Sequence, residues 1–243
     1  AFSEGGKRKD LPGNVIGFVL LFATLVPVAL QPDIGQTGLM AICWGGLVFL
    51  SGLHIFWVVG FSGVGVVGLA AAYKFLPHVK ARIDRFSDKQ SGDTFQVDNA
   101  YESFMQGGWF GKGPGEGTIK RILPDSHTDF IFAVTAEEFG IIVCLIVLLL
   151  FMIVVLRGLV LARRHDDPFC RLAAAGLVML FGVQSVINMA VNVQLMPAKG
   201  MTLPFISYGG SSLISLALGM GFLLAVTRKR PRAEFFTPSP YPL

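Results

Sequence analysis

The sequence predicts an all-α polytopic membrane protein, and three observations support this fold class. The chain of 243 residues is 53% hydrophobic and only 15% charged, with a mean hydropathy of +0.62, whereas soluble domains carry about a quarter charged residues. Its apolar residues gather in runs long enough to cross a bilayer. The 29 Gly and 21 Phe residues suit helices that pack through small side chains and face lipid with large ones. We therefore expect one integral membrane domain over residues 1–243.

Six apolar runs are expected to span the membrane as helices. Polar segments with glycine and proline separate them, and such segments end helices. The predicted spans are approximately 15–30, 37–50, 55–73, 128–156, 172–193 and 203–226. Between the third and fourth spans lies a long polar loop, residues 74–127, in which Phe95 to Phe104 has the spacing of a short interfacial helix. A basic tail, residues 227–243, follows the sixth span.

The basic residues predict the orientation of these spans. Lys and Arg cluster in the N-terminal segment, in residues 157–171 and at the start of the tail, whereas the short loops on the other side hold only Lys199. By the positive-inside rule both termini are cytoplasmic and the 74–127 loop is extracytoplasmic. The net charge of +4 is too small to indicate nucleic-acid binding. Cys43, Cys144 and Cys170 lack metal-ligand spacing, so we expect small buried residues and no metal site.

Asp129 is the leading candidate for chemistry. It precedes the fourth apolar run, and ionisable groups at the edge of a membrane are functional-site candidates by default. The competing interpretation is a helix cap, formed by Thr128 or Asp129. Several cations on the same side favour chemistry, because they would suit an anionic group such as phosphate. They are Lys112, Lys120, Arg121, Lys80, Arg82, Arg85 and Lys199. A carboxylate beside such a substrate can take a proton from a hydroxyl.

Other polar residues near the spans have open interpretations. Glu137 and Glu138 either face a water-filled groove or bond to neighbouring helices. Asn188, together with Gln184 and Asn192, favours hydrogen bonds between helices over contact with substrate. His127 either positions Asp129 or caps the helix. The glycine-rich segment 107–115 could bind phosphate through its backbone N–H groups, although it is no P-loop.

Several motifs, in the same order along nearly the whole chain, resemble the SEDS (shape, elongation, division and sporulation) family. They are Gln31–Asp33, Gly111–Gly113, Leu123–Phe132 (LPDSHTDFIF), Glu137–Gly140 and Pro204–Ser212. Segment Pro197–Pro204 is closer to the division members, because the elongation members usually lack a lysine at the position of Lys199. Since the family usually has ten spans, the chain resembles its C-terminal part, and its start at Ala1 without Met agrees with a fragment or a processed product.

The resemblance implies a peptidoglycan glycosyltransferase that polymerises lipid II into β-1,4 glycan strands, at the outer face of the bacterial inner membrane and at the division septum. Its H-T-D-F motif assigns Asp129 as the catalytic residue. Lipid II is α-linked to diphosphate and the product is β-linked, so transfer inverts the anomeric centre, needs a general base and releases undecaprenyl diphosphate. The candidates for substrate binding are Lys112, Arg121, Arg82 and Lys199 for the diphosphate, with His127, Glu138, Asn188 and Ser207. A divalent cation is a possible cofactor.

The resemblance also implies partners. These are lipid II and the nascent glycan, a class B penicillin-binding protein, divisome regulators and membrane lipids, and no nucleic acid. Two alternatives stay open: a flippase for lipid II, and a non-catalytic division scaffold. A carrier should place its polar groups near the midplane of the membrane, whereas these spans are mostly uncharged there, which favours the enzyme.

Overall fold

The computed structural model describes residues 3, 13–31, 33–52, 55–75, 77, 80–81, 84, 95–197 and 200–228. Every regular element within these residues is helical, which confirms the predicted all-α fold class. The elements are α2 (Gly13–Leu30), α3 (Ile34–Leu50), α4 (Ile55–Phe75), α6 (Phe95–Gly107), the 3-10 helix η1 (Ile119–Arg121), α7 (Ile131–Arg163), α8 (Pro168–Asn192) and α9 (Gly210–Thr227).

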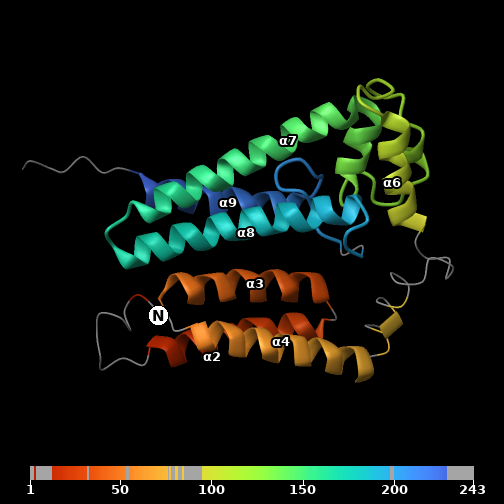
Figure 1. Ribbon diagram of the computed structural model, residues 1–243. Coiled ribbons are helices and arrows are strands. Elements are labelled where there is room, and N and C mark those ends of the chain that lie inside the picture. The colour runs from red at the N-terminus through yellow and green to blue at the C-terminus, as the bar shows by residue number, and fades with distance from the viewer. Residues whose placement is uncertain are drawn as a thin grey trace, which may run out of the picture.

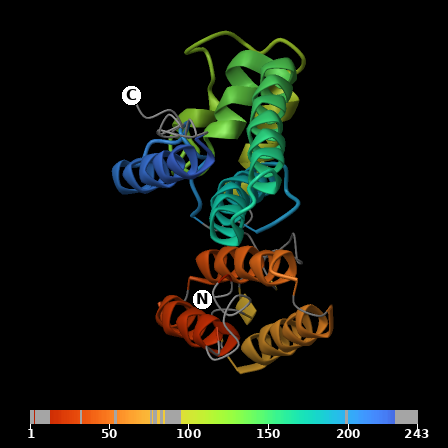
Figure 2. The ribbon, with the colours of Figure 1, turned by 90° about the vertical axis from the view of Figure 1, so that its left-hand side faces the viewer.

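The long helices form two groups that run in similar directions (Figure 1). One group holds α2, α3 and α4, and the other holds α7, α8 and α9. Viewed along the helices, α3 and α8 lie where the two groups meet (Figure 2). Helix α6 lies across the end of the second group and packs against the start of α7. The turn with the candidate residue Asp129, which precedes α7, lies at that end.

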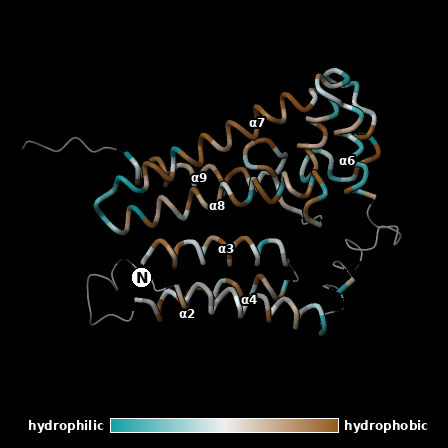
Figure 3. Tube along the Cα trace, in the orientation of Figure 1, coloured by the Kyte–Doolittle hydropathy of each residue, from teal (hydrophilic) through white to brown (hydrophobic). Residues whose placement is uncertain are grey.

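Three helices of the described residues are long and apolar enough to cross a membrane, namely α7, α8 and α9. Two shorter apolar helices, Val15–Leu30 and Gly35–Leu50, lie in the other group. Hydrophobic residues colour α7 along most of its length, and the turn that joins it to α8 is hydrophilic (Figure 3). Leu145, Leu149 and Met152 of α7 are exposed, as expected of a surface that faces lipid. The count of six spans stays a prediction.

Helix α9 begins later than the apolar run predicted, and helix α8 begins earlier. The sixth run starts at 203, but α9 begins only at Gly210, because Pro204 and Phe205 (φ 61°) turn the backbone first. The charged segment 157–171 is mostly helical. Helix α7 continues to Arg163, and α8 starts at Pro168, where the Asp167 side chain accepts a hydrogen bond from the Cys170 N–H (3.1 Å) and Pro occupies the first turn.

The short helix predicted from Phe95 is confirmed as α6, whose residues Val97, Ala100 and Ser103 are buried, while its place at the membrane interface stays a prediction. After α6 the chain docks onto α7 at Gly140, where α7 is interrupted by a non-helical residue (φ 81°, ψ 176°). The docked segment, residues 107–113, supplies partners for backbone groups that the interruption leaves free. The bonds are Lys112 N to Glu137 O (2.9 Å), Gly113 N to Glu138 O (3.0 Å), Ile141 N to Gly108 O (2.9 Å) and Ile142 N to Trp109 O (3.4 Å).

Close approach of two backbones explains the glycines of the docked segment. A Cβ on Gly107 would lie 1.9 Å from the Ala136 carbonyl oxygen, and one on Gly111 would lie 2.2 Å from that of Glu138. Only glycine fits such contacts. The N–H groups of Gly111, Lys112 and Gly113 all donate to carbonyl oxygens within the protein. The phosphate-binding interpretation of this glycine-rich segment is therefore wrong for these groups.

Candidate active site

Asp129 lies in a tight turn immediately before α7. The carbonyl oxygen of Asp125, a residue with φ of 54°, accepts hydrogen bonds from the N–H groups of Thr128 (3.1 Å), Asp129 (3.1 Å) and Phe130 (3.3 Å). Asp tolerates this left-handed conformation better than most residues. The N-cap of α7 is Phe130, without a side-chain capping bond, and the Thr128 hydroxyl donates to Asp125 O (3.1 Å). The capping interpretation of Thr128 and Asp129 is therefore wrong, and the Asp129 carboxylate is left for another task.

Two buried asparagines of α8 hold the backbone of this turn. The Asn188 amide donates to the carbonyl oxygens of Asp129 (2.8 Å) and Met201 (2.6 Å). The Asn192 amide donates to Asp129 O (3.0 Å) and Asn188 O (2.9 Å), and its side-chain oxygen accepts from the Ala133 N–H (3.0 Å). Their exposed fractions are 1% and 0%, and buried amides need such partners. The predicted role of Asn188 and Asn192 in bridging helices is confirmed. Asn188 thus contacts the backbone carbonyl group of Asp129.

The segment between α8 and α9 binds the turn from another side. The Ser207 hydroxyl donates to Thr128 O and accepts from the Leu203 N–H (2.7 Å), while the Tyr208 N–H donates to His127 O (2.9 Å). The carbonyl groups of three consecutive residues, 127 to 129, are thus all fixed. Ser207, predicted to contact substrate, is occupied by backbone groups and acts here as a positioning residue.

The environment of the Asp129 carboxylate favours its protonated form. The side chain is half-buried, and burial raises its pKa, with the negative charge of Asp125 raising the pKa further. Its neighbour is Gly200, where a Cβ would lie 3.6 Å from Asp129 Oδ2. A carboxylate with a raised pKa accepts a proton more readily, which is the property that a general base requires.

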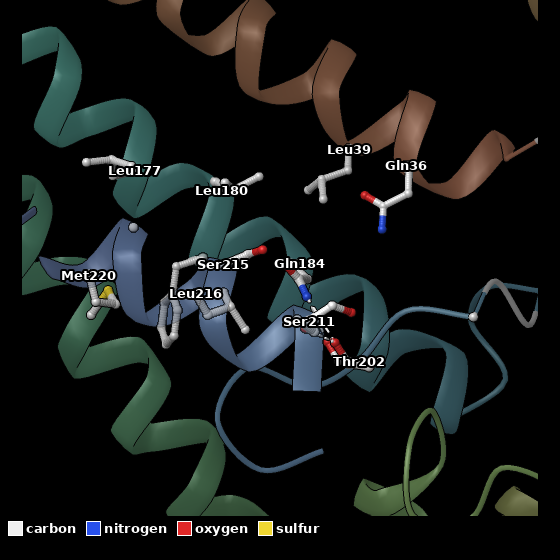
Figure 4. Close-up of a pocket in the computed structure, with 14 residues that line it drawn as sticks. Gln36, Leu39, Leu177, Leu180, Gln184, Thr202, Ser211, Ser215, Leu216 and Met220 are labelled. Carbon is white, nitrogen blue, oxygen red and sulfur yellow. Dashed lines mark hydrogen bonds between the residues drawn. The ribbon is translucent and has the colours of Figure 1, made fainter. Parts of the chain in front are cut away.

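A cavity of about 510 Å³ lies between α3, α8, α9 and the segment that follows Gly200. The polarity of its lining differs between its two ends (Figure 4). The polar side chains of Gln36, Gln184, Thr202 and Ser211 gather at one end, and the apolar side chains of Leu177, Leu216 and Met220 at the other. Bonds from Gln184 Nε2 to Thr202 O (3.0 Å) and between the Thr202 and Ser212 hydroxyls (2.7 Å) order the polar end. Since Gly200 both lines the cavity and lies beside the Asp129 carboxylate, the polar end adjoins Asp129.

The sequence matches, over residues 4–232, the family of cell cycle proteins that comprises FtsW, RodA and SpoVE. The chain belongs to this family. A relative from Caulobacter vibrioides (strain NA1000 / CB15N), named probable peptidoglycan glycosyltransferase FtsW, is 47% identical over 232 residues, which cover 96% of this chain and 60% of the relative. The SEDS resemblance seen in the motifs is thereby confirmed, as is its closeness to FtsW. The chain spans about three fifths of the length of the curated relatives it matches.

Solved structures of the same family share the fold. A structure described as a peptidoglycan synthase complex that coordinates polymerization and crosslinking has a TM-score of 0.73 and 30% identity, covering 89% of this chain and 62% of that chain. The Thermus thermophilus rod shape determining protein RodA has a TM-score of 0.58 and 26% identity, covering 88% and 55%. With its apolar helices, this member of the FtsW/RodA/SpoVE family is a multi-pass membrane protein.

Lys112, a residue of the docked segment, bonds side chains outside that segment. Its ammonium pairs with Glu137 (3.1 Å), which is fully buried, and also donates to Gln106 and to the Thr118 hydroxyl (3.3 Å). The Glu137 carboxylate accepts further bonds from the N–H groups of Thr118 (2.7 Å) and Ile119 (3.1 Å). This network joins the loop to α7. A role of Lys112 towards a diphosphate stays a prediction.

The remaining predicted residues lie in different places. Glu138 pairs with Lys120, which also donates to Gly115 O (3.0 Å), so bonding to a neighbouring element is the better interpretation for both glutamates. Arg121 and His127 are exposed. Arg82 and Lys199 lie outside the described residues.

The described residues do not form a metal site on their own. No three of their His, Cys, Asp and Glu side chains come close enough to hold an ion. Asp125 acts on Asp129 through its charge, and a Mg²⁺ ion is usually bound through one or two carboxylates together with substrate phosphates. The possible divalent cation stays a prediction.

One position of the site was not singled out from the sequence. Asn192 was predicted together with Asn188 to bridge helices, and since it lies four residues after Asn188 the two share one helix face. Gly200 offered no such signal, because its closeness to Asp129 depends on the packing of the loop that follows α8.

Proposed function

We propose that this chain carries the catalytic centre of a peptidoglycan glycosyltransferase of the FtsW type, with Asp129 as its general base. The observation that carries the proposal is the half-buried Asp129 carboxylate beside Gly200, a residue that lines the cavity. Asn188 and Asn192 hold the Asp129 carbonyl oxygen, and Ser207 holds that of Thr128. A carboxylate with a raised pKa, on a fixed backbone turn and next to a residue of the cavity wall, is suited to proton abstraction.

The proposed reaction joins two lipid II molecules. Asp129 takes the proton from the 4-hydroxyl of the acceptor sugar as that oxygen attacks the anomeric carbon of the donor. The bond between this carbon and the diphosphate breaks, the configuration inverts, and undecaprenyl diphosphate leaves with the bonding electrons. The proton on Asp129 then passes to solvent. A base in this position contributes about 10²–10⁴-fold to the rate.

The two-ended cavity supports a lipid-linked sugar as substrate. Its volume of about 510 Å³ lies within the usual range for ligand sites, about 300–1,000 Å³. Gln36, Gln184 and Ser211 offer hydrogen bonds to a saccharide near Asp129, and Leu177 and Met220 offer an apolar surface to the isoprenoid. For the leaving diphosphate, Arg121, Arg82 and Lys199 are the favoured cations, since Lys112 is paired with Glu137.

The setting of the reaction is part of the proposal. The positive-inside rule puts Asp129 on the outer face of the bacterial inner membrane, with both termini in the cytoplasm. The structure described as a peptidoglycan synthase complex couples polymerization to crosslinking, which supports a class B penicillin-binding protein and divisome regulators as partners. The names of the relatives support septal synthesis during cell division.

Polymerisation of purified lipid II by the full-length protein with its transpeptidase partner tests the proposal. Asp129→Asn is expected to abolish glycan strands, whereas Glu116→Gln, a change at an exposed acid of the same loop, should leave the rate unchanged. If Asp129→Asn forms glycan at the wild-type rate, the assignment of Asp129 as general base is wrong, and a non-catalytic division scaffold is favoured. Headgroup translocation in liposomes that survives Asp129→Asn, without polymerisation by the wild type, would favour a flippase.

A further inference from the structure

Trp109 and Phe110 form an exposed aromatic pair at the tip of the docked segment 107–113. Their side chains are 64% and 84% exposed. The backbone on both sides of the pair is bonded to α7: Gly108 O and Trp109 O accept from Ile141 and Ile142, and Lys112 N donates to Glu137 O. The backbone that carries the pair is therefore fixed against α7.

The depth of this pair follows from the length of the apolar part of α7. The run from Ile141 to Leu156 carries no charged residue and extends for about 24 Å at 1.5 Å a residue. The hydrocarbon core of a bilayer is about 30 Å thick, so the first residues of the run cannot lie far outside it. Since the Ile142 N–H donates to Trp109 O (3.4 Å), Trp109 lies at the level of the first turn of that run.

The surface of α7 at this level continues the aromatic pair. Phe139 is 43% exposed, and Ile142, Leu145 and Ile146 form an exposed apolar surface along the following turns. Aromatic side chains concentrate where the headgroups of a membrane meet the acyl chains. The surface of an established membrane helix thus extends without interruption onto the loop.

We propose that Trp109 and Phe110 insert into the lipid leaflet at the Asp129 end of the helix bundle. The docked segment is then bound on one side to α7 and on the other to lipid. Because its N–H groups bond the carbonyl oxygens of Glu137 and Glu138, which lie two turns beyond Asp129, contact with lipid fixes the height of the Asp129 turn above the acyl chains.

Depth-dependent fluorescence quenching tests this proposal. The full-length protein would be reconstituted into phosphatidylcholine vesicles with Trp109 as its single tryptophan, through Trp44→Phe, Trp57→Phe and the same change elsewhere. We expect lipids brominated near the headgroup end of the acyl chain to quench Trp109 severalfold more than lipids brominated near the methyl end. Aqueous iodide should leave its emission nearly unchanged.

Two matched reporters in the same background with Trp109→Phe calibrate the measurement. Glu116→Trp places a tryptophan on an exposed loop residue and should be quenched by iodide, and Ile146→Trp places one on the exposed part of α7 and should be quenched by the deeper bromines. Quenching of Trp109 by iodide to the level of Glu116→Trp would overturn the proposal. Protection of Trp109 from both quenchers would also overturn it, since protein would then cover the pair.

Discussion

Asn192 joins two parts of the site through one side chain, donating to the Asp129 carbonyl oxygen (3.0 Å) and accepting from the Ala133 N–H (3.0 Å). These partners lie on either side of the N-cap of α7. The side chain is fully buried, so water cannot replace Asn192 as the partner of these groups. The position of the proposed base therefore depends on a residue that does not line the cavity.

Replacing Asn192 by alanine is expected to lower kcat for lipid II polymerisation while KM changes little. The Ala133 N–H would lose its side-chain acceptor, at a cost of about 1–3 kcal/mol, and the Asp129 carbonyl oxygen would be held by Asn188 alone. Each 1.4 kcal/mol of lost transition-state stabilisation lowers the rate about tenfold. Asn99→Ala, at a partly exposed position of α6 whose amide bonds only its own helix, is the control. A larger effect on KM than on kcat would indicate that Asn192 contacts substrate.

The neighbouring charge of Asp125 makes the pH dependence of activity a test of the base. Asp129 must be ionised to accept a proton, so kcat/KM should fall as the pH drops through its raised pKa. Asp125→Asn removes one of the two causes of that raised pKa and should move the acidic limb of the pH profile to lower pH. Glu116→Gln should leave the limb in place. A limb that stays fixed in Asp125→Asn would assign it to another group.

The same raised pKa predicts a gain in stability from Asp129→Asn. The folded protein binds the Asp129 proton more tightly than the unfolded chain, so the contribution of this group to stability is lost as the pH rises from the unfolded-state pKa through the folded-state pKa. At neutral pH the ionised carboxylate then destabilises the fold relative to a neutral amide. Thermal unfolding in detergent should show a higher Tm for Asp129→Asn at pH 7 and a smaller difference in acid. A lower Tm at pH 7 would contradict the assignment of burial as the main cause.

Gly107→Ala should loosen the docked segment. The added Cβ would lie 1.9 Å from a backbone oxygen, so the segment must move, and such overpacking costs about 1–3 kcal/mol or more. Hydrogen exchange at the Ile141 and Ile142 amides should become faster. Gly210→Ala, where a Cβ meets no atom within 4 Å, is the matched control and should leave exchange at these amides unchanged.

Lys112→Ala separates a structural role from a role towards substrate. If the ammonium chiefly neutralises buried Glu137, its loss should lower the free energy of unfolding by about 1–3 kcal/mol. Adding Glu137→Gln should recover part of this loss, because the remaining side chain is uncharged. A fall in polymerisation rate with an unchanged free energy of unfolding would instead support the predicted role of Lys112 in binding the diphosphate.

The sequence predicts the all-helical class and the place of Asp129 well, because apolar runs and an acid at a span boundary are local patterns. The bridging role of Asn188 was also accessible, since an amide within an apolar span must find partners. The start of α9 at Gly210 could not be predicted from the sequence, because Phe205 adopts positive φ within a segment whose apolar residues resemble a continuing helix. The docked segment 107–113 was not accessible either. Its N–H groups bond carbonyl oxygens some twenty-five residues further along, and nothing in the glycine pattern distinguishes a protein carbonyl from a phosphate oxygen as acceptor.

The interruption of α7 at Gly140 has a consequence for the synthesis of the protein. Segment 107–113 precedes α7 in the chain, and domains form in the order in which the ribosome delivers them. The N–H groups of Lys112 and Gly113 therefore meet their acceptors only after Glu137 and Glu138 have been made. Docking of this segment beside the proposed catalytic centre therefore cannot precede the synthesis of the first turns of α7.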